Sequence, residues 1–271
     1  MSNPAGKIRA RRLYYGWLVV MTVGLAGFAQ SPGTFPVLSV LLTPITEEFH
    51  WNRTVFAGAT STGSILGGVV AFLLGAVLDR FGPRWIMTGA LLVLGGALLL
   101  LSLISALWQF YLLIILTRVA TMGVLGLALG VVVPKWFVVK RGRAVALSGI
   151  GGVAGGSITP LYVGMVAEMI SWRAAAATAG LVVWAVALLP SILFLRRRPE
   201  DMGLLPDGLS QEELRHIQTP GQNAASTRAR TEVSYTLRQV LRFRSFYLLV
   251  AAFTLLLVVM PGMVLHMVAY L

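Results

Sequence analysis

The stretch of sequence that decides the fold is GAVLDRFGPRW, which runs from Gly75 to Trp85. It joins two apolar segments, near residues 55–78 and 85–106. Each is long enough to cross a hydrocarbon core of about 30 Å as a helix of about 20 residues. Gly82 and Pro83 predict a tight turn between these helices. The stretch is therefore a short charged connection between two membrane spans.

The small and charged residues of this connection predict a gate. Gly75 allows a neighbouring helix to approach closely. Asp79 lies at a helix end, where its carboxylate can pair with a basic residue or a helix N-terminus. Such a contact can hold the cytoplasmic side of a bundle in one state, although an ordinary basic turn remains the alternative. The predicted gating residues are Gly75, Asp79, Arg80, Gly82 and Arg84.

The composition indicates an all-α integral membrane protein. Of the 271 residues, 57% are hydrophobic and 12% are charged, and the mean hydropathy is +0.81. We predict a six-helix N-terminal bundle over residues 1–195, a cytoplasmic central loop over 196–245 and a seventh span over 246–271. The spans are expected near residues 15–42, 55–78, 85–106, 108–133, 144–168, 174–195 and 246–271.

The basic residues predict the topology. With the N-terminus in the cytoplasm, 19 of the 22 Lys and Arg residues fall in inside segments, two fall outside, and one, Arg118, lies within a span. This asymmetry follows the positive-inside rule. It explains the net charge of +12 without a nucleic acid partner, because the charge faces an anionic lipid leaflet. We expect a multi-pass protein of the inner (plasma) membrane that contacts membrane lipids.

The sequence argues against an enzyme. There are no cysteines, and the three histidines, His50, His216 and His266, have no second ligand at metal-binding spacing. No paired intramembrane acids and no serine beside a base are present. We therefore predict no catalytic residues, no metal and no cofactor.

Arg118 is the leading candidate for substrate binding. It lies ten residues past Trp108, about 15 Å down a helix, which places it near the middle of the fourth span. A charge at this depth is costly and normally faces a cavity or a partner. Its guanidinium can bind a carboxylate through two hydrogen bonds. The alternative is a structural pairing with Glu168 or with a backbone carbonyl.

Span 1 supplies further candidates. Pro32 and Pro36 leave backbone carbonyls without partners inside the helix, which is tolerated at membrane depth where protein or water lines the break. Gln30 and Thr34 share one face and can line a cavity, although polar contacts between helices explain them equally well. The weaker candidates for the same cavity are Tyr162 and His266.

Four strings resemble a known family. The connection from Gly75 to Trp85 resembles the loop motif of the major facilitator superfamily. The string KWFVVKRGRAVALSGIGGVAGGSITP, from Lys135 to Pro160, is similar to a signature of its monocarboxylate-transporter-like and oxalate/formate-antiporter-like members. YYGW at Tyr14–Trp17 and RRRPEDMGLLPDG at Arg196–Gly208 resemble two further strings of these members.

The resemblance implies a twelve-helix carrier. It implies secondary active transport of small organic anions by alternating access, with protons or a counter-anion as the coupling partner. The chain departs from the pattern because span 1 lacks a basic residue between Tyr15 and Leu42. We also expect a missing C-terminal half, since the sequence stops within the seventh predicted span. The alternatives are a drug or metabolite efflux carrier and an inactive truncated membrane protein.

Overall fold

The computed structural model describes residues 14–208 and 237–255, in which every regular element is a helix. The chain divides into two compact units, residues 1–216 and 217–271, which are described separately. In the first unit, six helices are long and apolar enough to cross a membrane, which confirms the predicted fold class. They are Tyr15–Phe49, Arg53–Gly75, Pro83–Leu101, Leu107–Trp136, Arg141–Met169 and Trp172–Phe194.

Three of these spans contain a short 3-10 or π-helical segment. Span 1 comprises α1 (Tyr15–Ala29), the 3-10 turn η1 (Ser31–Gly33) and α2 (Phe35–Phe49). Span 4 comprises α5 (Leu107–Arg118), the π-helix η2 (Val119–Leu125) and α6 (Gly126–Trp136). Span 6 comprises α8 (Trp172–Val183), the π-helix η3 (Trp184–Leu188) and α9 (Leu189–Phe194). The uninterrupted spans are α3 (Arg53–Phe81), α4 (Pro83–Leu101) and α7 (Arg141–Met169).

The break in span 1 follows from its prolines. Pro36 has no N–H, so the helical hydrogen bond that would reach the carbonyl of Pro32 cannot form. The chain instead tightens at Ser31–Gly33, where the amide of Thr34 donates to the carbonyl of Ser31 at 2.9 Å. Helix α2 then begins at Phe35 with Pro36 in its first turn, where a missing donor has no cost.

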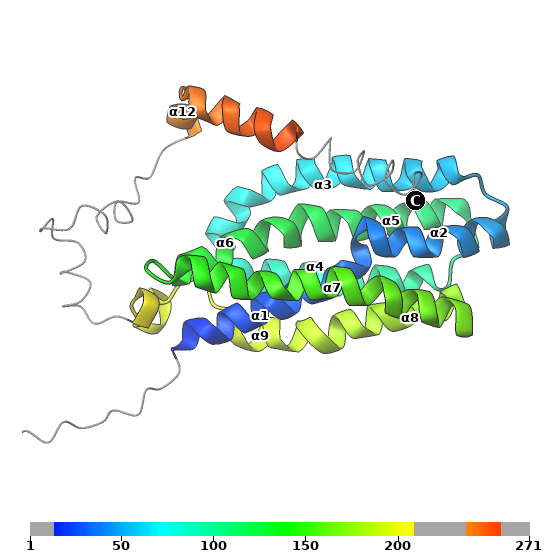
Figure 1. Cartoon of the computed structure of the whole chain (residues 1–271), viewed down its shortest axis with the longest axis horizontal. Helices are drawn as coiled ribbons and strands as arrows, with labels where there is room; N and C mark the ends of the chain where they lie inside the picture. Colours follow the sequence, from blue (N-terminus) through cyan, green and yellow to red (C-terminus); the bar gives the residue numbers. More distant parts are fainter. Residues whose placement is uncertain (1–13, 209–236, 256–271) are drawn as a thin grey trace, which may run out of the picture. The chain divides into compact units, whose positions relative to one another are not determined.

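The spans pack in three main pairs: α1 with α7, α3 with η2, and α4 with α8. Figure 1 shows these long helices lying side by side in the first unit. The α1–α7 pair is the closest, because Gly151 and Gly155 of α7 lie directly against the backbone of Gly24 and Phe28. Gly151 and Gly155, which belong to the Lys135–Pro160 string, therefore pack span 5 on span 1.

Residues 196–208 belong to the first unit, together with the six spans. They form the 3-10 turns η4 (Glu200–Met202) and η5 (Pro206–Gly208) and contact α6. The predicted central loop thus begins as ordered structure. Its middle, residues 209–236, lies outside the described residues.

The second unit contains α12 (Leu237–Val240), a turn, and the apolar helix Arg244–Leu255. Helix α12 ends at Val240, and the chain turns at residues 241–242. The predicted seventh span begins within the second helix. Residues 256–271, its remainder, lie outside the described residues.

Candidate functional site

Arg118 ends α5 and is buried, with 4% of its surface exposed. Its Nη1 donates to the carbonyl of Gly33 at 3.1 Å. Its Nε and Nη2 donate to Ser64 Oγ at 3.3 and 2.9 Å, and Nη2 also lies 3.1 Å from the sulfur of Met122. The guanidinium therefore links span 4 to span 2 and to the break in span 1.

Glycines in span 2 make room for this side chain. A Cβ on Gly63 would lie 2.7 Å from the Cβ of Arg118, so only glycine fits there. One turn further along, a Cβ on Gly123 would lie 2.8 Å from the carbonyl oxygen of Gly67. The wider turn of the π-helix η2 lies at this crossing, and such turns frequently occur at functional sites.

The partners of Arg118 are electrically neutral. In the part of the chain that the structure describes, no carboxylate lies within salt-bridge distance of the guanidinium. Of the two structural partners considered from the sequence, Arg118 contacts a backbone carbonyl and not Glu168, which is exposed near the end of α7. Among the described residues, its partners are therefore a hydroxyl, a carbonyl and a thioether group.

The other predicted binding residues fall into three groups. Gln30 and Thr34 flank the span 1 break, both half-buried, and Thr34 donates to the carbonyl of Ser31 at 2.6 Å. Tyr162 is half-buried in α7 and packs against the apolar core. His266 lies outside the described residues. The structure thus brings Arg118 to the same break as Gln30 and Thr34, since its partner Gly33 adjoins Thr34.

Two hydroxyl residues of this cluster were not predicted from the sequence. Ser64 is the main partner of the guanidinium. Thr117 is fully buried beside it, and its Oγ1 has no hydrogen-bond partner among the described residues. A serine next to Gly63 in an apolar span was the available signal for Ser64. Its partner could not be read from spacing, because the two residues are 54 positions apart.

The predicted gate is only partly formed by the described residues. Gly82 has a φ of +80° and ends α3, as the tight turn requires. Arg80 and Arg84 lie over the neighbouring rings of Phe81 and Trp85, at 5.6 and 5.2 Å. Nothing is described of the side chain of Asp79, so its role stays a prediction.

Gly75 lies on an open part of α3 among the described residues. No neighbouring helix that the structure describes comes within 4 Å of the position that a Cβ on Gly75 would occupy. Within the described bundle, α3 packs on span 4 through Gly63 and Gly67, at other levels of the helix. The part of Gly75 in a gate therefore stays a prediction.

Asp207 clamps the segment after span 6 to the start of span 5. It is 5% exposed, and its carboxylate accepts hydrogen bonds from the amides of Val138, Val139 and Lys140 at 2.7, 2.6 and 3.0 Å. These amides precede α7, whose first turn leaves backbone donors unpaired. The sequence offered one signal, the Asp-Gly step, since Asp tolerates the left-handed φ of +59° found here.

Tyr14 packs in the same region. Its hydroxyl donates to the carbonyl of Trp136 at 3.2 Å, and its ring meets Phe137 edge-on. Burial, followed by the carboxylates of Asp207 and Glu200, raises the pKa of Tyr14 to about 12. Three of the strings singled out in the sequence thus meet at one end of the bundle. They are Tyr14–Trp17, Lys135–Pro160 and Arg196–Gly208.

The end of α2 and the start of α8 also meet. Glu48 accepts hydrogen bonds from Trp172 Nε1 and Arg173 Nη2, both at 2.6 Å. Arg173 also donates to the carbonyl of Ser102 at 3.3 Å and lies 5.7 Å from the ring centre of Phe49. Spans 1, 3 and 6 are therefore tied together at this end. Trp172 is buried, which supports a structural role for it.

The fold and the site together define a multi-pass α-helical membrane protein of the transporter type, with a buried cation where two spans break. The chain belongs to the Major Facilitator Superfamily, whose family model matches residues 9–271. It is also similar to a fungal protein, the MFS-type transporter phiD of Fungal sp. (strain ATCC 74256). That protein is 25% identical over 156 residues, which cover 58% of this chain and 24% of the relative.

Proposed function

We propose that this chain serves in the secondary active transport of small organic anions, by alternating access together with a second helical bundle. Arg118 would recognise the carboxylate, with Gln30, Thr34 and Tyr162 lining the path. The proposed part of His266 in binding rests on the sequence alone. Protons or a counter-anion would couple the movement. The residues that connect spans 2 and 3, Asp79 among them, would keep the cytoplasmic gate in one state.

The observation that carries this proposal is that the partners of Arg118 among the described residues carry no negative charge. A guanidinium at mid-bilayer costs about 2.5–3.5 kcal/mol on insertion scales. Its neutral partners leave a net positive charge inside the bundle, which favours an entering anion. An arginine fork also matches the geometry of a carboxylate. An anion would replace the hydroxyl of Ser64 or the carbonyl of Gly33 as the partner of the guanidinium.

Substitution of Arg118 tests the proposal. Arg118→Gln should weaken carboxylate recognition at least about tenfold, because hydrogen bonds to charged groups contribute about 1.5–3 kcal/mol. Arg118→Lys keeps the charge, loses the planar fork and should give a smaller loss. The measurement is the uptake of labelled oxalate, formate and lactate by proteoliposomes that hold the chain with a second bundle of the same family. Arg53→Gln, at the exposed outer end of α3, is the matched control.

Two outcomes would contradict this assignment. Unchanged anion uptake in both Arg118 variants, with a lowered melting temperature, would make Arg118 a structural partner of Ser64 and Gly33. Arginine-independent movement of neutral drugs, with no anion transport in the parent, would favour the efflux carrier instead.

We also propose that the N-terminus lies in the cytoplasm of a plasma-membrane protein, supported by the distribution of basic residues. Gly6→Cys and His50→Cys on this cysteine-free chain test the orientation. An impermeant maleimide added to intact cells should label position 50, which is exposed after α2, and spare position 6. Labelling of position 6 with none at position 50 would invert the topology.

A further inference from the structure

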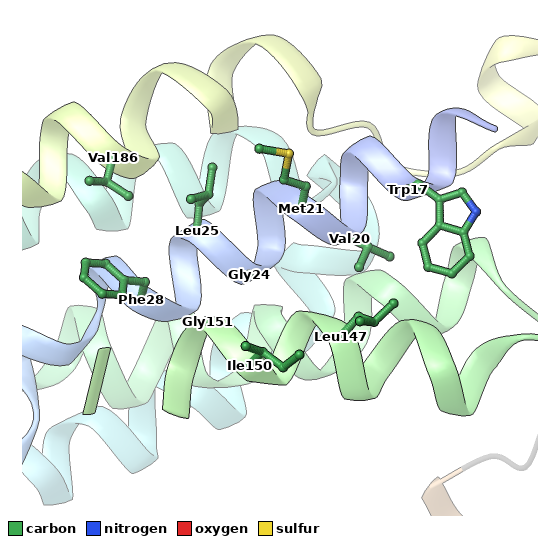
Figure 2. Close-up of a pocket in the computed structure, with 10 residues that line it drawn as sticks. All are labelled: Trp17, Val20, Met21, Gly24, Leu25, Phe28, Leu147, Ile150, Gly151 and Val186. Atoms are coloured by element: carbon green, nitrogen blue, oxygen red, sulfur yellow. The ribbon is translucent and has the colours of Figure 1, made fainter. Parts of the chain in front are cut away.

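An apolar groove of about 520 Å³ lies apart from the Arg118 site. Its floor is α1, and α7 and the π-helix η3 of span 6 form its walls (Figure 2). None of the residues that line it is charged. They are Trp17, Val20, Met21, Gly24, Leu25, Phe28, Leu147, Ile150, Gly151 and Val186.

The groove is open and shaped by glycines. Gly24 and Gly151, where α1 and α7 approach most closely, contribute no side chain to its floor. Met21 and Ile150 stand on either side with exposed fractions of 63% and 59%. The result is a recess between helices, bordered by flexible apolar side chains.

The length of the groove along α1 matches the thickness of the hydrocarbon layer of one leaflet. Trp17 and Phe28 are eleven residues apart in α1, a helical rise of about 16 Å. That distance is about half of a hydrocarbon core of about 30 Å. Trp17 lies two residues after the start of the span, so its indole marks the membrane interface. With the orientation proposed above, the groove faces the inner leaflet.

The mouth of the groove is basic. Arg143 is four and seven residues before Leu147 and Ile150, so it continues their stripe of α7 toward the cytoplasm and is exposed there. The residues that precede α7 and begin its first turn also include Lys140 and Arg141, so this end of α7 is basic. A positive end next to an apolar channel complements an anionic amphiphile.

We propose that this groove is a binding site for an anionic glycerophospholipid of the inner leaflet. One acyl chain lies along α1 between α7 and span 6, and the phosphate is held by Arg143 at the mouth. The inference rests on the proposed orientation and not on the substrate. The bound lipid would fill the recess beside the α1–α7 contact and stabilise it.

The test compares lipids that differ only in headgroup charge. The purified 271-residue chain in detergent is mixed with phosphatidylglycerol or with phosphatidylcholine of the same acyl chains. Native mass spectrometry counts retained lipid, and melting temperature reports stabilisation. We expect phosphatidylglycerol to be retained and to raise the melting temperature. Phosphatidylcholine should be retained at least about fivefold less, because its choline cancels the net negative charge that attracts basic residues.

Variants locate the site. Arg143→Gln should reduce phosphatidylglycerol retention to about the level of phosphatidylcholine. Met21→Trp and Val186→Trp, which fill the groove from two sides, should lower it further. Because Met21 is mostly exposed, Met21→Trp leaves the core intact and keeps the test informative if Val186→Trp misfolds. Arg53→Gln, at the other end of the bundle, should change nothing.

Equal retention of the two lipids, or retention of phosphatidylglycerol unaffected by Arg143→Gln and by Met21→Trp, would overturn the proposal. Displacement of an apolar drug, but not of lipid, by the groove-filling variants would also overturn it and assign the groove to a substrate. None of these readouts measures anion transport, so their failure is distinguishable from a failure of the proposed function.

Discussion

We expect Gly151→Ala to destabilise the described bundle more than any other single added methyl group. A Cβ at this position would clash with the carbonyl oxygen of Gly24 and lie 2.9 Å from its Cα. These are backbone atoms of α1, so no rotamer change relieves the clash. Overpacking in cores costs about 1–3 kcal/mol. A clash of two backbones forces the helices apart, and we expect a loss of at least about 3 kcal/mol.

The matched control is Gly149→Ala, two residues earlier in α7. No described atom lies within 4 Å of a Cβ there, so alanine should be neutral or stabilise the helix by up to about 1 kcal/mol. Gly155→Ala should resemble Gly151→Ala, since its Cβ would lie 2.6 Å from the carbonyl of Phe28. Thermal unfolding and the monodisperse fraction in size-exclusion chromatography measure the difference. Equal stability of the Gly151 and Gly149 variants would show that α1 and α7 are not in close contact.

The sequence was most informative about elements that depend on local composition. The six spans agree with the predicted segments within a few residues, except span 1, whose helix continues to Phe49. That span was predicted to end near residue 42, before Pro44. Pro44 lies inside α2 nevertheless. The length of an apolar segment therefore locates a membrane span. It does not show how far the helix continues beyond the membrane.

Contacts between distant residues could not be predicted. The depth of Arg118 followed from helical rise, but its bonds to Gly33 and Ser64 depend on how three spans cross. The clamp of Asp207 joins residues 67–69 positions apart and requires an ordered return of the chain over the bundle. The sequence predicted only a cytoplasmic central loop here. Proline and glycine serve ordered turns as well as mobile segments, and composition alone does not separate the two.

Asp207→Ala is expected to release this clamp. Three backbone amides would lose a charged acceptor, and hydrogen bonds to charged groups contribute about 1.5–3 kcal/mol. Part of this contribution is helix capping, since the amides immediately precede α7. We expect the free energy of unfolding to fall by about 2–3 kcal/mol. Asp201→Ala is the control, because Asp201 is exposed in the same segment.

The charge of Asp207 should also be visible in the titration of Tyr14. Its pKa is raised to about 12 by burial first and by Asp207 second, so the folded state favours the neutral phenol. The stabilisation that follows is complete below the ordinary tyrosine pKa of about 10 and is lost as the pH rises through about 12. Asp207→Asn removes the second cause and should lower the pKa of Tyr14, so that the upper end of this window moves to lower pH. Tyrosinate absorbance, corrected with Tyr14→Phe, measures the shift. An unchanged Tyr14 titration in a stable Asp207→Asn chain would mean that the segment carrying Asp207 does not dock against the bundle.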